Sequence, residues 1–170
     1  MKIKSLQDVF VTGLKYTYDA EQKLVKKGLP KMIDSATSAE LRGALEQHLQ
    51  ETRNHVTRLD RIFAIVRVEP KAEDNDVVDE MTKVVEHMIG ATEDGSALRD
   101  VVLIYGGNQV EHYEITSYGT LKAIATQLGL NEAATLLEQT LQEEKAADKK
   151  LTEIGERSVN TQAAQGRRAA

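Results

Sequence analysis

The stretch Glu111-His112-Tyr113-Glu114-Ile115 places two acidic residues on the apolar face of a long predicted helix, which runs from about Ala97 to Leu128. Apolar residues recur there every three or four positions, which is the period of an amphipathic helix. On this spacing Glu111 and Glu114 point towards the core. Burying a carboxylate is unfavourable unless it is paired, hydrogen-bonded or bound to a metal ion. The stretch therefore predicts a helix in a bundle and a polar site inside that bundle.

Three other apolar stripes are interrupted by acidic residues in the same way. Each has a helical period and a serine, threonine or asparagine near its start that suits an N-cap. The first stripe begins near Ser5, has a kink or end at Pro30 and continues towards Asp34. The second begins near Thr37 or Ser38 and ends before Pro70. The last begins at Asn131 and ends near Ile154. Their interrupting residues are Glu21 in the first stripe, Glu51 and His55 in the second, and Glu144 and Asp148 in the last.

The composition favours one soluble, all-α domain. The chain has 170 residues, only 4% aromatic residues and two prolines, with abundant helix-forming residues. It has no cysteine, which excludes disulfides and thiolate metal sites. A net charge of −5 gives no basic field for nucleic acid. No apolar segment approaches the roughly 20 residues that cross a membrane, and no signal peptide is recognisable, so a cytoplasmic location is expected.

The order of the predicted helices indicates a ferritin-like four-helix bundle. A shorter helix, from about Val77 to Ile89, lies in the connection between the second and third long helices, and the other two connections are short. A long central crossover allows the second and third helices to run parallel. We expect the bundle to occupy residues 1–158, and residues 159–170, which lack apolar periodicity, to form a flexible tail.

The joint placement of these acids predicts a dinuclear metal site. Di-iron and dimanganese bundles take one Glu from each of two helices and a Glu-x-x-His pair from each of the other two. Carboxylates and imidazole suit Fe or Mn, and we expect two such ions per chain, bridged by carboxylates such as Glu51 and Glu144. The candidate ligands are Glu21, Glu51, His55, Glu111, Glu114, Glu144 and Asp148.

The chain departs from that template at two points. The second helix has Glu-x-x-x-His, and in the last helix Asp148 stands where the template has a histidine. His48 and His112 are spare candidates, although His48 also fits an ordinary hydrogen-bonded histidine on a helix face. Each acid, taken alone, also fits a partly exposed position at the edge of a stripe. A non-catalytic bundle, with its acids in internal salt bridges, is therefore the alternative.

Several segments resemble the bacterial YciE/YciF family of ferritin-like stress-response proteins. They are residues 18–22, 51–55, 111–115, 118–121 and 143–148, and the similarity extends from about Leu6 to Ile154. The Glu111–Ile115 segment followed by Tyr118-Gly119-Thr120-Leu121 is its most specific part. The resemblance implies a rubrerythrin-related bundle, often a homodimer, with a dinuclear metal site. It implies no settled reaction.

Two functions follow from these expectations. The first is oxidation of Fe(II), or reduction of O2 or peroxide, at a dinuclear centre during stress. The second is a non-catalytic role through protein–protein interaction. Protection of DNA is disfavoured by the acidic net charge.

Overall fold

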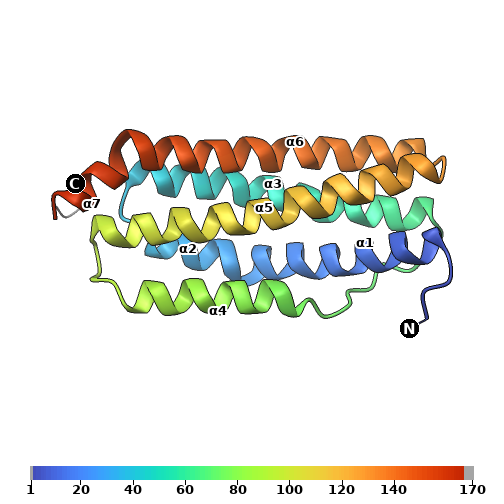
Figure 1. The fold of residues 1–170 in the computed structure, drawn as a ribbon, viewed down its shortest axis with the longest axis horizontal. Coiled ribbons are helices and arrows are strands. Elements are labelled where there is room, and N and C mark those ends of the chain that lie inside the picture. Colours follow the sequence, from blue (N-terminus) through green and yellow to red (C-terminus); the bar gives the residue numbers. More distant parts are fainter. Residues whose placement is uncertain (1, 167–170) are drawn as a thin grey trace.

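The computed structural model describes residues 2–166, which form helices and connecting segments without a β-strand among them. Figure 1 shows α1, α3, α5 and α6 side by side as a bundle, with α4 along its outside. The elements are α1 (Leu6–Lys23), the π-helical turn η1 (Leu24–Gly28), α2 (Leu29–Ser35), α3 (Ala39–Ile65), α4 (Asp76–Gly90), α5 (Ala97–Gln127), α6 (Asn131–Ile154), the π-helical turn η2 (Gly155–Val159) and α7 (Asn160–Ala164). Among residues 2–166, no helix combines the length and apolar character that a membrane crossing requires.

The helix directions confirm the predicted ferritin-like connectivity. Helices α3 and α5 run in one direction, and α1 and α6 run in the other (Figure 1). The chain passes from the end of α3 to the start of α5 through residues 66–96, which include α4. This crossover brings the chain back along the bundle, so that two consecutive long helices lie parallel.

The first long helix continues past Pro30 by means of a wider turn. Proline has no backbone N–H, so it interrupts the regular helical ladder. In the structure the preceding turn, η1, is π-helical, and the N–H of Leu29 binds the carbonyl of Leu24. Such bulges absorb a local break without ending a helix. The chain therefore remains helical to Ser35, close to the predicted end near Asp34.

The C-terminal segment differs from the expected tail. Helix α6 continues through η2 into α7, which ends at Ala164. Val159 is 2% exposed and belongs to the apolar core. A single apolar side chain carries no periodicity, so its packing could not be read from the sequence. Residues 167–170 of the predicted tail lie outside the described residues.

Two buried polar side chains fix the connections. Asn75 caps α4, its backbone N–H donates to Asp19 at 2.9 Å, and its amide donates to the Tyr113 hydroxyl at 2.7 Å. Asp100 on α5 accepts hydrogen bonds from the backbone N–H groups of Thr37 and Ser38, both at 2.8 Å. The first set holds the crossover against α1 and α5, and the second holds the α2–α3 turn against α5.

The apolar core consists of two clusters that lie on either side of the acidic positions. Helices α3, α5 and α6 contribute to both clusters, and the first helix contributes to one through α1 and to the other through η1 and α2. Leu24, Leu49, Val110 and Leu151 belong to one cluster, and Tyr18, Leu59, Tyr118 and Leu141 belong to the other. The bundle therefore places a polar layer between two well-packed apolar ends.

The adjacent glycines of α5 admit a helix on each side. A Cβ added at Gly106 would lie 2.4 Å from Val85 Cγ2 of α4, and one at Gly107 would lie 2.7 Å from Leu151 Cδ1 of α6. Neither distance leaves room for a methyl group. The Gly106-Gly107 pair therefore lets both neighbouring helices approach α5 closely, and Gly106 seats α4 against α5.

We predict that Gly106→Ala weakens the packing of α4. Crowding of this kind lowers the free energy of unfolding by about 1–3 kcal/mol, measured by urea denaturation. Gly119→Ala, on the same helix, is the matched control because its added Cβ meets nothing within 4 Å. That control should be neutral or stabilising by up to about 1 kcal/mol. Equal losses from the two variants would contradict the packing role of Gly106.

Candidate metal centre

Six titratable side chains from four helices meet in the layer between the two apolar clusters. Each belongs to a buried residue, with at most 6% of its surface exposed. They are Glu21 of α1, His48 and His55 of α3, Glu111 and Glu114 of α5, and Glu144 of α6. Among the described residues, they make up two groups whose potential ligand atoms lie within 4.8 Å of one another.

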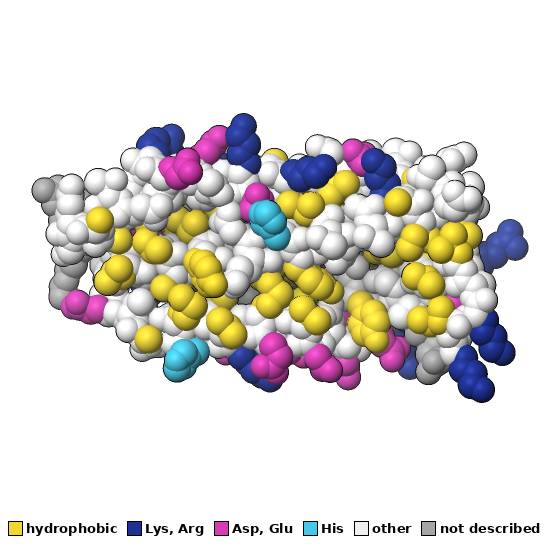
Figure 2. All heavy atoms as spheres, viewed as in Figure 1, with side chains coloured by type: hydrophobic (Ala, Val, Ile, Leu, Met, Phe, Trp, Pro, Cys, Tyr) yellow, Lys and Arg dark blue, Asp and Glu magenta, His cyan; other side chains and the backbone are white. Residues whose placement is uncertain are grey.

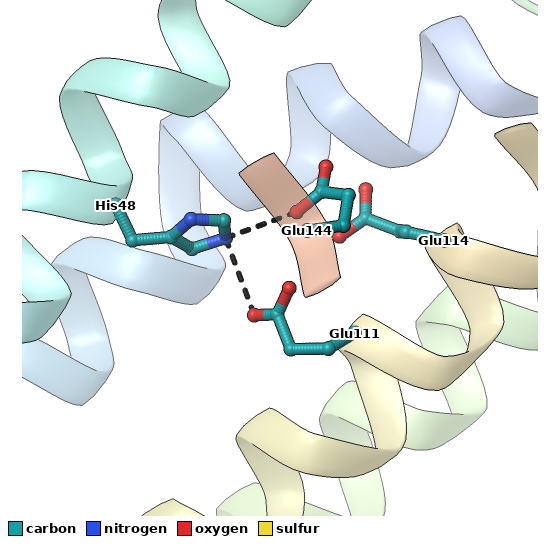
Figure 3. Close-up of side chains that lie close together, drawn as sticks. All are labelled: His48, Glu111, Glu114 and Glu144. Atoms are coloured by element: carbon teal, nitrogen blue, oxygen red, sulfur yellow. Dashed lines mark ion pairs between the residues drawn. The ribbon is translucent and has the colours of Figure 1, made fainter. Parts of the chain in front are cut away.

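The first group contains His48, Glu111, Glu114 and Glu144 (Figure 3). His48 Nε2 lies 3.2 Å from Glu111 Oε1 and 3.7 Å from Glu144 Oε2. In the close-up the imidazole points from α3 towards the three carboxylates of α5 and α6. Glu111 and Glu114 share a face of α5 because they are three residues apart. The group therefore offers one imidazole nitrogen and three carboxylates to a single ion.

The second group contains Glu21, His55 and Glu144. His55 Nδ1 lies 3.0 Å from Glu144 Oε1 and 3.3 Å from Glu21 Oε1. Glu144 thus belongs to both groups, with Oε1 near His55 and Oε2 near His48. A carboxylate placed in this way can bridge two ions, one bound through each oxygen.

The hydrogen bonding of the layer fits two bound cations. Buried polar atoms normally have hydrogen-bond partners. Here eight buried donor or acceptor atoms of the layer have none: Glu21 Oε2, Glu111 Oε2, both oxygens of Glu114 and of Glu144, and Nδ1 of His48 and of His55. Ligands at right angles around an octahedral ion with bonds near 2.1 Å are about 3 Å apart. The His55 contacts at 3.0 and 3.3 Å have that spacing without hydrogen-bond alignment.

Electrostatics shows that the acids of the layer depend on bound protons when no metal is present. Burial raises the pKa of Glu114 well above its usual range, and the neighbouring carboxylates raise it further. Burial alone would lower the pKa of His55, but the carboxylates of Glu144 and Glu21 outweigh it and raise that pKa to about 10. Protons therefore balance the acids in the absence of metal. Metal binding would displace these protons, because ligating carboxylates and imidazoles must be deprotonated.

An outer set of side chains orients the inner one. His55 Nε2 lies 2.8 Å from Glu143, whose carboxylate accepts two hydrogen bonds from Arg58, at 2.5 and 2.8 Å. The Tyr118 hydroxyl donates to Glu21. Hydrogen bonds of this kind fix the orientation and tautomer of a ligand. Glu143 is adjacent to Glu144 in sequence, so one turn of α6 supplies both sides of the His55 ring.

Two of the predicted ligands lie outside both groups. Glu51 is partly exposed, accepts a hydrogen bond from Gln47 at 2.8 Å and lies 3.5 Å from His48 Nδ1. Asp148 accepts a hydrogen bond from Asn108 at 2.9 Å and contacts the exposed His112. Four residues advance a helix by slightly more than one turn, about 6 Å along its axis. This displacement takes Asp148 past the layer that Glu144 reaches.

His48, which is only a spare candidate on the sequence alone, belongs to the inner site. Its ring lies on the same face of α3 as His55, two helical turns away, because seven residues separate them. That spacing was visible in the sequence. The Glu-x-x-His template predicts that an acid on the same helix accompanies each histidine. In the structure, the inner carboxylates approach His48 from other helices, α5 and α6.

Comparison with known proteins identifies the family. The profile described as "Domain of unknown function (DUF892)" matches residues 5–164. The chain belongs to this family. Protein YciF of Escherichia coli (strain K12) is 37% identical over 169 residues, which cover 96% of this chain and 98% of YciF. The resemblance to the YciE/YciF family is therefore confirmed.

Solved structures of the DUF892 protein's relatives share its fold. The crystal structure of the E. coli stress protein YciF superposes with a TM-score of 0.87 at 37% identity, over 93% of this chain and 99% of YciF. YcfI of Rhodopseudomonas palustris, for which a structural role has been proposed, gives a TM-score of 0.85 at 36% identity, over 89% and 95% of the two chains. A Xanthomonas campestris protein at 22% identity gives 0.73 over 95% and 98%, and supports the fold alone.

We predict that Glu114→Gln stabilises the metal-free protein. Both Glu114 oxygens lack hydrogen-bond partners, and the side chain is surrounded by other acids. Folding at neutral pH must add a proton to Glu114 because its pKa is raised, whereas Gln is neutral without that step. The gain is about 1.4 kcal/mol for each unit by which the pKa is raised above the pH. The measurement is thermal unfolding in the presence of a chelator. Glu46→Gln on the exposed surface of α3 is the control and should change stability by less than about 0.5 kcal/mol. A lower melting temperature for Glu114→Gln would contradict this account.

Proposed function

We propose that this DUF892 protein binds a dinuclear Fe or Mn centre and uses it in stress to oxidise Fe(II) or to reduce peroxide or O2. The observation that carries the proposal is the sharing of Glu144 between two buried ligand groups. One shared carboxylate is what two adjacent ions require, whereas a single ion or a set of salt bridges does not. Oxygen and imidazole donors without thiolate favour Fe or Mn over softer metals.

The charge of the layer supports two divalent ions. The two groups contain four carboxylates, those of Glu21, Glu111, Glu114 and Glu144, and two imidazoles. Four negative charges and two neutral imidazoles are balanced by two divalent cations. A site filled in this way carries no net charge, which avoids the cost of burying net charge. His48, Glu111 and Glu114 would hold one ion, Glu21 and His55 the other, and Glu144 both.

The chain's own residues define what could react there. Bound Fe or Mn would supply two one-electron changes, the number needed to reduce one peroxide to two waters with two protons. Arg58 and Glu143 hold the His55 ring, and Tyr118 holds Glu21. Burial raises the pKa of Tyr118 well above its usual range, and the nearby carboxylates add to that effect, so its hydroxyl stays a donor. The apolar clusters pack against the layer at both of its ends and exclude water there.

The assignment to stress rests on the relatives. The E. coli YciF structure is described as that of a stress protein, and this chain aligns with it over nearly its whole length. A buried site for Fe or Mn is suited to oxidants that accumulate in stress. The proposed role in stress therefore rests on the family, and the proposed metal site rests on the geometry of the layer.

We predict that the reconstituted protein binds two Fe or Mn ions per chain, measured by elemental analysis after removal of free metal. Glu144→Gln should lose both, because Glu144 belongs to both groups, whereas Glu21→Gln should keep the ion of the His48 group. Glu138→Gln, a partly exposed acid of the same helix that pairs with Lys122 outside the layer, is the control and should retain two. Two ions retained by Glu144→Gln would contradict the shared position.

Thermal unfolding separates this function from the alternative. Ligands that bind the native state stabilise it by about 3–4 kcal/mol at 100 to 1,000 times their dissociation constant. Chelation should therefore lower the melting temperature clearly. An unchanged melting temperature, together with less than one ion per chain, would favour a non-catalytic bundle that acts through protein partners, as the structural role proposed for YcfI suggests.

We also propose that the protein forms a homodimer through the face of α4 and α5. Four large apolar side chains on α4 and α5 are about half exposed: Val77, Val84, Leu98 and Tyr105. Figure 2 shows apolar side chains spread over this face. A hollow of about 740 Å³ beside Met81 and Tyr105 could receive side chains of a second copy. Large exposed apolar areas commonly mark interaction sites.

We predict that Val84→Asp shifts the protein towards a monomer in light scattering after size exclusion. A charge in the interface must lose its hydration without gaining a partner. Val9→Asp on α1, another exposed apolar position, is the control and should leave the mass unchanged. A monomeric wild-type protein, or an unaltered mass for Val84→Asp, would contradict this interface.

A further inference from the structure

One hollow of the structure reaches the metal layer. It lies between α3, α5 and α6, has a volume of about 260 Å³, and has His48 and Glu111 in its wall. A water molecule occupies about 30 Å³ of liquid, so this space holds several. The larger hollow beside α4 has none of the six inner side chains in its lining. The smaller hollow, which we term the His48 pocket, is therefore the one to consider for access.

Two of the six inner residues line the inner wall of the His48 pocket, and each has a buried ligand atom behind that wall. His48 and Glu111 are 6% and 3% exposed, and His48 Nδ1 and Glu111 Oε2 have no hydrogen-bond partner. The opposite side of the layer is closed, because Glu143 and Arg58 cover the His55 ring and Arg58 also donates to Thr140. The two histidines therefore differ in their surroundings. Glu143 and Arg58 cover the outer side of His55, whereas the outer side of His48 lines a pocket.

Two charged residues of opposite sign line the mouth of the His48 pocket. Glu51 and Lys150 lie there on α3 and α6, and the Glu51 side chain is 28% exposed. The 3.5 Å distance from Glu51 Oε2 to His48 Nδ1 is too long for a firm hydrogen bond. Gln47 binds only one Glu51 oxygen. Glu51 is thus a carboxylate at the boundary between solvent and the buried ligands.

We propose that the His48 pocket is the route by which divalent metal ions reach the dinuclear centre, with Glu51 as the carboxylate that first captures them and Lys150 as the charge that opposes them. This inference rests on the proposed metal function. A hydrated cation is attracted to Glu51, exchanges water for its carboxylate, and passes to His48 and Glu111 behind it. Glu51 then acts on the rate of uptake, and the six inner residues set the number of ions bound.

The test is the rate of Co(II) uptake by metal-free protein, followed by stopped-flow absorbance without oxygen. Glu51→Gln should slow uptake by about tenfold, and Lys150→Gln should accelerate it, because a single charge at an access path changes association rates by this order. The matched controls are Glu46→Gln and Lys145→Gln, which make the same charge changes on α3 and α6 outside the pocket lining. Both controls should bind at the wild-type rate, and every variant should reach the wild-type number of ions.

The outcomes separate the route from the function. Wild-type protein that binds no metal would overturn the metal function, and the route with it. Normal stoichiometry with unchanged rates in Glu51→Gln and Lys150→Gln would overturn the route alone. Equal rate changes in the control variants would show a general charge effect and also overturn it. A loss of bound metal in Glu51→Gln would make Glu51 a ligand of the filled site rather than a residue of the access path.

Discussion

The burial of four carboxylates with too few hydrogen bonds is the constraint on which the rest of this structure depends. A bundle of this size could be filled with apolar side chains alone. Such a bundle would be more stable than the metal-free form of this one. Instead, each long helix breaks its apolar stripe at the same level. The two apolar clusters on either side must then hold the helices together while the layer between them stays polar. Stability and the proposed chemistry therefore make opposite demands on the same residues.

Glu144 is the buried carboxylate with the strictest positional requirement, because it contacts both histidines of the layer. Its two oxygens approach His55 and His48, two turns apart on α3. The position is useful only if α6 is fixed relative to α3 in both height and rotation. The Arg58–Glu143 pair fixes α6 to α3 directly beside Glu144, where a bidentate guanidinium–carboxylate contact gives strong geometric control. The contact that orients His55 thus also positions the shared carboxylate.

Helix α4, which lies outside the bundle of four long helices, serves a different purpose. The crossover that contains it lets α3 and α5 run parallel, which places the ligand-bearing faces of the two helices at the same level. Asn75 anchors the start of α4 to α1 and α5, and Gly106 lets α4 pack closely on α5. These contacts secure the longest connection of the bundle. They also leave the outer face of α4 available to a second copy of the chain.

The sequence by itself determined the helices, their order and the ferritin-like connectivity, because these follow from local periodicity, capping residues and connection lengths. It also located Glu21, His55, Glu111, Glu114 and Glu144, since an acid in the middle of an apolar stripe is visible without a fold. Only the tertiary structure decided that His48 joins them, and that Glu51 and Asp148 do not enter either group. Spacing along one helix fixes which side chains share a face. The height and rotation of neighbouring helices fix which of those side chains meet, and these depend on packing contacts such as Arg58–Glu143 that join residues 85 positions apart in the chain.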